Sequence, residues 1–240
     1  MAYDSNNRWT ASANLSATQA GIDVGLRNYM LRVYNYMAGG LAITGVVAYW
    51  AAASGLYLKI AQTPLIWLVV FAPLGMVLFL SVRLQRMSLG AAQASFWVFA
   101  ALMGLSLSYL FLVYTGTSIA EVFFITAATF LAMSLYGYTT KRDLAGFGSF
   151  LFMGLIGIII ASLVNLFFAS AAVQFAISVI GVLVFTGLTA WDTQRIKEMY
   201  IESDGSAVAG KKAIMGALAL YLDFINLFIM LMQLMGNRRN

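Results

Sequence analysis

The sequence predicts an all-α polytopic membrane protein with seven transmembrane helices. Of its 240 residues, 62% are hydrophobic and only 10% are charged, whereas a soluble domain has about 45–50% apolar and about 25% charged residues. The apolar residues gather in seven runs, each near the roughly 20 residues that a helix needs to cross a bilayer. The connections between the runs are short, so we expect one compact membrane domain over residues 21–240.

The chain begins with a polar stretch, which we expect to form a disordered cytoplasmic arm over residues 1–20. Residues 21–32 then predict a short helix in the membrane interface, because apolar side chains recur on one helical face. That face comprises Ile22, Leu26, Tyr29, Met30 and Val33. The seven membrane-spanning runs that follow lie at about 33–55, 65–82, 95–114, 119–138, 146–168, 171–191 and 213–235.

Small residues recur within these runs at spacings that are typical of close contact between membrane helices. They include Ala38, Gly39, Gly40, Ala42 and Gly45 in the first run, with Gly154 and Gly157 in the fifth. We expect neighbouring helices to approach each other closely at these positions.

Lysine and arginine gather on one side of the predicted domain. If all seven runs cross, eleven of the 14 basic residues lie on the side of the N-terminus, and such an excess marks the cytoplasmic side. Arg238 and Arg239 oppose this arrangement, unless the run at 213–235 is re-entrant; its length favours a crossing. A nucleic-acid partner is not expected, because no basic stripe with interleaved aromatic residues is present.

The chain contains neither cysteine nor histidine. These absences exclude thiol chemistry, iron–sulfur sites and the usual histidine base or zinc ligand. The last run also lacks the lysine that a retinal Schiff base would need. We therefore expect no enzyme and no tightly bound cofactor, and any proton chemistry near neutral pH must use carboxyl groups.

Two aspartates lie in or beside these apolar runs. Asp223 is about ten residues into the last run, or about 15 Å along a helix, and an ionised carboxylate costs at least a few kcal/mol in lipid. It must therefore face the protein interior, with Asn226 and Gln233 on the same helical face. Asp192 ends the sixth run. Asp223 could instead serve a structural hydrogen-bond network, and Asp192 could pair locally with Arg195.

Four further residues are candidates, two as counter-ions of the aspartates and two as part of a polar route. Arg83 and Arg86 end the second run, where either is a counter-ion for the aspartates or an interfacial anchor. Glu121 lies near the outer end of the fourth run, and Thr189 lies one turn before Asp192.

Two carboxyl groups that lie close together cannot both ionise cheaply, so they titrate as a unit. Asp192 and Asp223 would then sense protons, and their oxygens would also suit calcium as metal ligands.

Two motifs resemble those of one family. Residues Tyr221-Leu222-Asp223-Phe224-Ile225-Asn226-Leu227-Phe228 resemble the C-terminal signature of the Bax inhibitor-1 (transmembrane Bax inhibitor motif) family. Residues Trp191-Asp192-Thr193-Gln194-Arg195-Ile196 resemble its Tyr-Asp-Thr-Gln-x-Ile stretch, with Trp in place of Tyr. The resemblance covers residues 28–236, and the polar arm resembles that of bacterial members, which implies the bacterial inner membrane.

The resemblance implies a seven-helix fold with the C-terminal helix at its centre. It also implies a pH-sensitive calcium leak channel in which Asp192 and Asp223 form the sensor and an arginine of the second helix, Arg83 or Arg86, latches the closed state. Calcium ions, protons and the lipid bilayer are then the partners, with calcium as the permeant ion.

Two other functions compete with the channel. One is a membrane scaffold that regulates a membrane protease or a stress-response partner without ion transport. The other is a di-aspartyl intramembrane protease, which needs a Gly-x-Gly-Asp motif; here Leu220-Tyr221-Leu222 precede Asp223, so the motif is missing.

Overall fold

The structure is a computed structural model that describes residues 5–239, with side chains from residue 24 onward. These residues are helical and contain no strand. The helices are α1 (Ser5–Ala53), α2 (Leu56–Ala61), α3 (Leu65–Arg83), the 3-10 turn η1 (Leu84–Arg86), α4 (Leu89–Leu107), α5 (Tyr109–Val113), α6 (Gly116–Thr139), α7 (Ala145–Phe168), α8 (Ala171–Glu198) and α9 (Ser206–Met235).

Seven stretches are long and apolar enough to cross a membrane, which confirms the predicted number of spans. They are Val24–Ala53, Leu65–Arg86, Leu89–Val113, Gly116–Thr139, Ala145–Phe168, Ala171–Glu198 and Ser206–Met235. Each contains one of the runs expected from the sequence, apart from shifts at the ends.

The N-terminal part of the chain differs from the expectation. α1 runs without a break from Ser5 to Ala53, so residues 21–32 form no separate interfacial helix, and the expected arm coincides largely with the start of α1. No proline interrupts this stretch, which removes the strongest signal that ends a helix. The first four residues of the expected arm lie outside the described residues.

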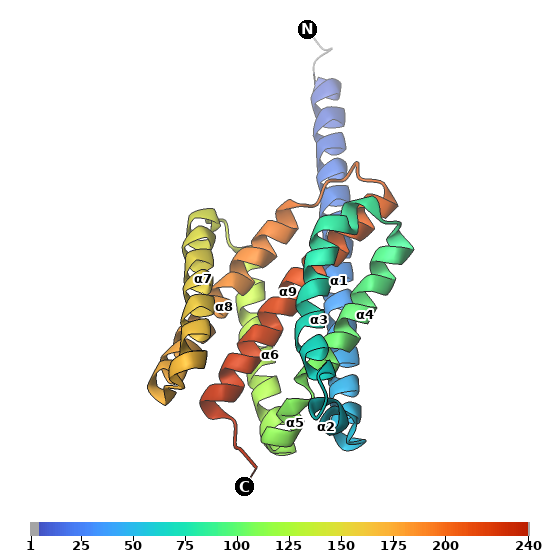
Figure 1. Ribbon diagram of the computed structural model, residues 1–240. Coiled ribbons are helices and arrows are strands. Elements are labelled where there is room, and N and C mark those ends of the chain that lie inside the picture. The colour runs from blue at the N-terminus through green and yellow to red at the C-terminus, as the bar shows by residue number, and fades with distance from the viewer. Residues whose placement is uncertain (1–4, 240) are drawn as a thin grey trace.

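The C-terminal helix α9 lies at the centre of the bundle, as the family resemblance implied (Figure 1). It packs against α1, α4, α6 and α8. In its most apolar window 67% of the residues are buried inside the protein, against 17% for α3 and for α7. Those two helices are therefore peripheral: α7 packs on α8, and α3 packs mainly on α4.

Small residues bring several helices together, but only some of the small residues predicted from their spacing lie at such contacts. A Cβ atom on Gly40 would meet Phe96 and Tyr221, and one on Gly154 would lie 3.2 Å from Val184 Cγ2. By contrast, Gly45 and Gly157 have no heavy atom of a neighbouring element within 4 Å.

The tightest backbone approaches involve two glycines outside the predicted set. A Cβ atom on Gly104 of α4 would lie 2.6 Å from the Thr44 carbonyl oxygen of α1. A Cβ atom on Gly137 of α6 would overlap the Ala190 carbonyl of α8.

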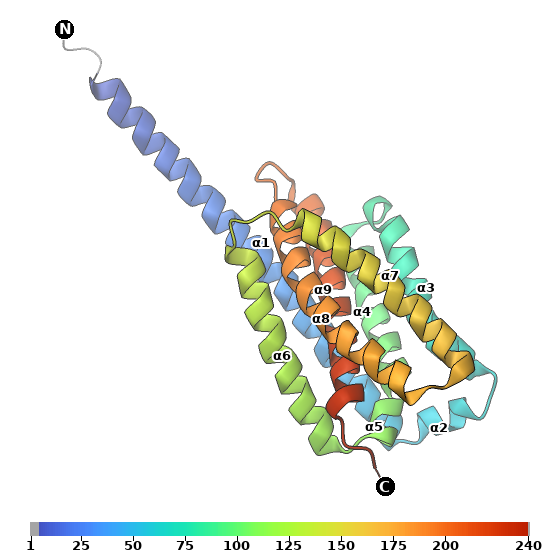
Figure 2. The same cartoon turned by 90° about the vertical axis from the view of Figure 1, so that its left-hand side faces the viewer.

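The path of α9 supports a crossing rather than a re-entrant loop. In both Figure 1 and Figure 2, α1 and α9 begin at the same end of the bundle, and α9 ends at the opposite end. There the tail after α9 is fixed to the start of α6, because Asn237 accepts a hydrogen bond from Thr115 N (3.0 Å) and donates one to Ser118 Oγ (2.9 Å). Arg238 and Arg239 therefore lie at the end of the bundle away from the start of α1.

Candidate functional site

Asp192 and Asp223 face each other between α8 and α9, the two helices that carry the family motifs. Their side chains lie within hydrogen-bonding reach of each other. Asp223 is only 5% exposed, and the Asp192 side chain is 13% exposed. The structure thus brings together the two residues that the sequence singled out at separate depths.

A hydrogen bond between the two carboxyl groups needs a proton on one of them. An ionised carboxylate only accepts hydrogen bonds, whereas a protonated one can also donate. Within the described part of the chain, the Oδ2 atom of Asp223 is buried without a hydrogen-bond partner, so no backbone amide or hydroxyl compensates a charge there. A shared proton would remove one of the two charges at this buried contact.

One cation is placed at the pair. Arg195 Nη1 lies 3.8 Å from Asp192 Oδ1, one helical turn away. The Arg195 side chain is 60% exposed, so solvent screens this ion pair and it contributes little by itself. The local pairing with Arg195 that the sequence left open is thus present, and it coexists with the contact between the aspartates.

A small cavity opens beside Asp192 towards the end of the bundle where α9 begins. Its volume is about 210 Å³, and it lies between α3, α8 and α9. Arg195 is the one cation among its lining residues, and α3 contributes Val77 and Ser81 to the wall. Of the two aspartates, Asp192 lines this cavity.

A larger cavity of about 700 Å³ lies on the other side of the pair, among α3, α4, α7, α8 and α9. Asn226 and Met230 of α9 line it, as does Pro73 of α3. Val77 and Leu222 line both cavities. The two cavities therefore adjoin at these two apolar side chains, and Leu222 is next to Asp223 along α9.

Of the two polar residues predicted to share a face of α9 with Asp223, only Asn226 lines this cavity. Asn226 lines the larger cavity, although its side-chain amide also donates to the Leu222 carbonyl oxygen at 2.8 Å. Gln233, further along α9, accepts hydrogen bonds from Gln174 Nε2 and Ser178 Oγ, both at 2.8 Å. Gln233 thus joins α9 to α8.

That amide network includes residues that the sequence reasoning missed. Gln174 also accepts a hydrogen bond from Asn165 Nδ2 at 3.3 Å, so the network links α7, α8 and α9. Gln174 and Ser178 lie one turn apart on the apolar run at 171–191, and this polar pair within the run is the signal that would have identified them.

The remaining predicted residues lie apart from the pair. Arg83 and Arg86 are exposed at the end of α3 and in η1, and no ion pair within residues 24–239 joins either of them to Asp192. Glu121 is exposed on α6. Thr189 is fully buried and donates to the Phe185 carbonyl oxygen at 2.8 Å. The second-helix latch and a route past Glu121 stay predictions.

The described residues contain no group of three or more acidic or other metal-ligating side chains. Calcium takes about six to eight oxygen ligands in a stable site, so Asp192 and Asp223 alone are too few to hold it tightly. Coordination of calcium by this pair stays a prediction.

Comparison with known proteins gives one family and several bacterial relatives. Residues 26–240 match the family described as "Inhibitor of apoptosis-promoting Bax1". The chain is 53% identical to an uncharacterised protein of Rickettsia prowazekii over 233 residues, which are 97% of this chain and 99% of that one.

Two other relatives are named as membrane proteins. The inner membrane protein YbhL of Escherichia coli is 50% identical over 219 residues, which cover 90% of this chain and 94% of that protein. An uncharacterised membrane protein of Streptococcus pyogenes is 37% identical over 217 residues, which cover 89% of this chain and 94% of that one. These relatives and the seven apolar helices indicate a multi-pass protein of the inner membrane.

Proposed function

Because the chain belongs to the Bax inhibitor-1 family, we propose that it is a pH-sensitive calcium leak channel gated by Asp192 and Asp223. The observation that supports the proposal most strongly is the position of the pair. Two largely buried carboxyl groups meet beside Leu222, which lines both a cavity of about 210 Å³ and one of about 700 Å³. In this proposal Val77 and Leu222 are the barrier between the cavities, and a change in protonation of the pair moves that barrier.

The closed state binds a proton that the open state releases. While the carboxyl groups share a proton, α8 and α9 remain in contact and Val77 and Leu222 keep the cavities apart. When the shared proton leaves, two negative charges face each other in an environment of low dielectric, where their repulsion is strong. Raising the pH therefore favours the separated state, and the calcium leak should rise with pH.

The helix best placed to yield is α3. It packs mainly on α4, and the space between it and α8 and α9 is where the two cavities lie. Pro73 lies inside α3 and lines the larger cavity. Because proline has no N–H group, the hydrogen bond to the Val69 carbonyl is missing and α3 bends there more easily. Movement of α3 would withdraw Val77 from Leu222.

The same carboxyl groups would select the permeant ion. Once ionised, they present oxygen atoms to a cation that enters the small cavity, and carboxylate oxygens are suitable ligands for calcium. Because only two carboxylates are present, the ion is not trapped, which a conducting site requires. The expected function is ion transport without a chemical reaction. We expect the N-terminus to lie in the cytoplasm.

The proposal is tested on purified protein in liposomes that contain no other protein. A calcium-sensitive dye inside the liposomes should report a leak that exceeds the leak of empty liposomes and increases as the pH is raised. The alternative, a scaffold that regulates a membrane protein, predicts no leak at any pH. A silent bilayer would therefore contradict the channel.

A further inference from the structure

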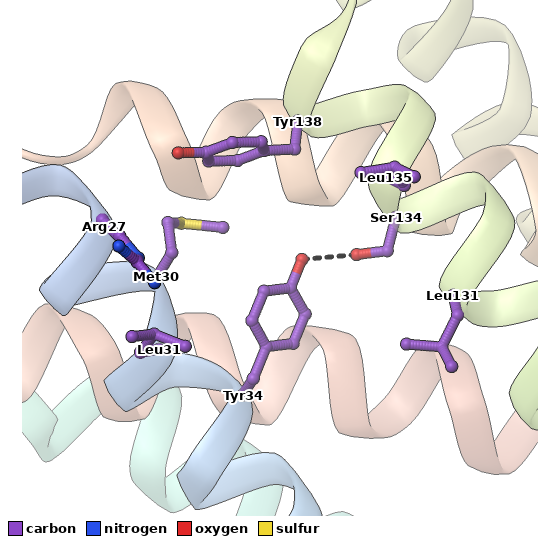
Figure 3. A pocket seen from close by; sticks show the side chains of 8 residues that line it. All are labelled: Arg27, Met30, Leu31, Tyr34, Leu131, Ser134, Leu135 and Tyr138. Carbon is purple, nitrogen blue, oxygen red and sulfur yellow. Dashed lines mark hydrogen bonds between the residues drawn. The ribbon is translucent and has the colours of Figure 1, made fainter. Parts of the chain in front are cut away.

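An apolar groove lies between α1 and α6, away from the carboxyl pair (Figure 3). Its volume is about 420 Å³, which is within the range of about 300–1,000 Å³ that is typical of small-molecule sites. The lining residues come from these two helices alone: Arg27, Met30, Leu31, Tyr34, Leu131, Ser134, Leu135 and Tyr138.

The groove exists because its two walls hardly touch each other. α1 and α6 each pack against α9, but they do not pack along one another. One hydrogen bond between Tyr34 Oη and Ser134 Oγ connects them across the floor (Figure 3). Ser134 Oγ also lies 3.0 Å from Thr193 Oγ1 of α8, so the polar atoms of the floor satisfy one another and leave the rest of the surface apolar.

One cationic side chain, Arg27, stands at one end of this groove. Arg27 is exposed and lies at the same end of the groove as Tyr138, whereas Leu131 lies about two helical turns before Tyr138 on α6. Lys197 does not line the groove; its ammonium lies over the Tyr138 ring, 5.3 Å from the centroid, and donates to the Tyr138 carbonyl oxygen at 2.9 Å. The groove thus combines an apolar length with one arginine at its mouth.

We propose that this groove binds an anionic phospholipid, with its phosphate at Arg27 and an acyl chain along Leu31, Leu131 and Leu135. Leu31, Leu131 and Leu135 are 49%, 63% and 64% exposed, respectively, so the chain has an open apolar wall to cover. Basic pockets between membrane helices at the cytoplasmic side bind anionic head groups in this way. The mouth lies at the end of the bundle that carries eleven of the 14 basic residues.

The charge at the mouth favours this occupant over two others. A zwitterionic lipid would fill the same apolar length but would gain little from Arg27. A helix from another protein would need to bury the arginine side chain against its own surface, at a cost unless it supplied an acidic partner. The lipid site does not depend on the proposed calcium leak, because it involves none of the cavity-lining residues of the carboxyl pair.

The experiment measures lipid binding to the purified full chain by native mass spectrometry. Phosphatidylglycerol and phosphatidylethanolamine with identical acyl chains serve as probes. We expect phosphatidylglycerol to bind preferentially and Arg27→Gln to weaken it about fivefold, since one basic residue contributes about 1 kcal/mol towards an anionic lipid. Arg32→Gln is the matched control, because Arg32 is an exposed arginine of the same helix that does not line the groove.

A second variant tests the apolar wall without changing charge. Leu131 is 63% exposed in the groove, so the larger side chain of Leu131→Trp should fill the groove and reduce binding of phosphatidylglycerol. Leu183→Trp is the control, because Leu183 is a 67% exposed leucine of α8 outside the groove, and this variant should bind the lipid normally. The proposal would be overturned if Arg27→Gln and Arg32→Gln weakened binding of phosphatidylglycerol equally. Equal binding of the two lipids, or unchanged binding of phosphatidylglycerol by Leu131→Trp, would also overturn it. Co-purification of a protein in the groove, lost on Leu131→Trp, would also overturn it.

Discussion

Tyr221, inside the C-terminal family motif, fixes the central helix to its neighbours. Its ring is fully buried against Phe96 and Phe99 of α4, with ring centroids 6.3 and 5.2 Å apart. Its hydroxyl lies 2.7 Å from Thr44 Oγ1 of α1, and Thr44 in turn donates to the Ala100 carbonyl oxygen. One side chain thus links three helices, two residues before Asp223.

Replacing Tyr221 with phenylalanine should keep the aromatic packing and remove the hydrogen bond to Thr44. We expect a loss of about 1 kcal/mol in the free energy of unfolding, the usual contribution of a buried hydrogen bond. Thermal unfolding in detergent measures the change. Tyr49→Phe is the control, because the Tyr49 ring is 63% exposed; an equal effect of both substitutions would refute the anchoring role of Tyr221.

The sequence identified the two aspartates but not the cation that lies beside them. Asp223 was identifiable from its depth in an apolar run, and Asp192 was tied to it by the family resemblance. Neither argument gives the rotation of α3 about its axis. Arg83 and Arg86 therefore remained candidates for a latch, whereas the structure places Arg195 beside Asp192.

At the scale of elements, the contact between α6 and α8 depends on the absence of a side chain at Gly137. A Cβ atom there would overlap the backbone of Ala190, two residues before Asp192. The composition of the runs predicted the spans correctly, because hydrophobicity alone decides whether a helix can lie in lipid. It did not predict this crossing, because the contact point depends on how two helices are tilted and rotated.

Gly137→Leu should push α6 away from α8 and prevent correct folding. Gly157→Leu introduces the same side chain on α7, where nothing of a neighbouring element lies within 4 Å of the added Cβ atom, and should be tolerated. The yield of monodisperse protein in size-exclusion chromatography measures both variants. Normal yield from Gly137→Leu, or equal losses from the two, would contradict the close contact between α6 and α8.

At the scale of the whole molecule, the uneven distribution of basic residues predicts which end of the bundle faces the cytoplasm. The chain contains no cysteine, so single cysteines can report the orientation without a background. Thr63 and Ser203 are both exposed, in the α2–α3 and α8–α9 connections, respectively. These connections lie at opposite ends of the bundle (Figure 2).

A thiol reagent that cannot cross the inner membrane should label Thr63→Cys in cells with a permeabilised outer membrane. It should leave Ser203→Cys unlabelled until the inner membrane is broken. This result follows from the excess of lysine and arginine at the end of Ser203. The reverse pattern would place the N-terminus outside the cytoplasm.

The orientation matters for gating, because the small cavity that reaches Asp192 opens towards the end of the bundle with most basic residues. In the proposed channel, with that end in the cytoplasm, Asp192 and Asp223 would exchange their proton with the cytoplasm. The leak would then respond to cytoplasmic pH.

The most direct test of the shared proton is the pH dependence of calcium entry into liposomes containing Asp223→Asn. Asparagine keeps the size of the side chain but cannot form a second negative charge beside Asp192. We predict that the wild-type leak rises with pH, whereas the leaks of Asp223→Asn and of Asp192→Asn lose this dependence. If both variants keep the wild-type pH profile, the pair is not the sensor.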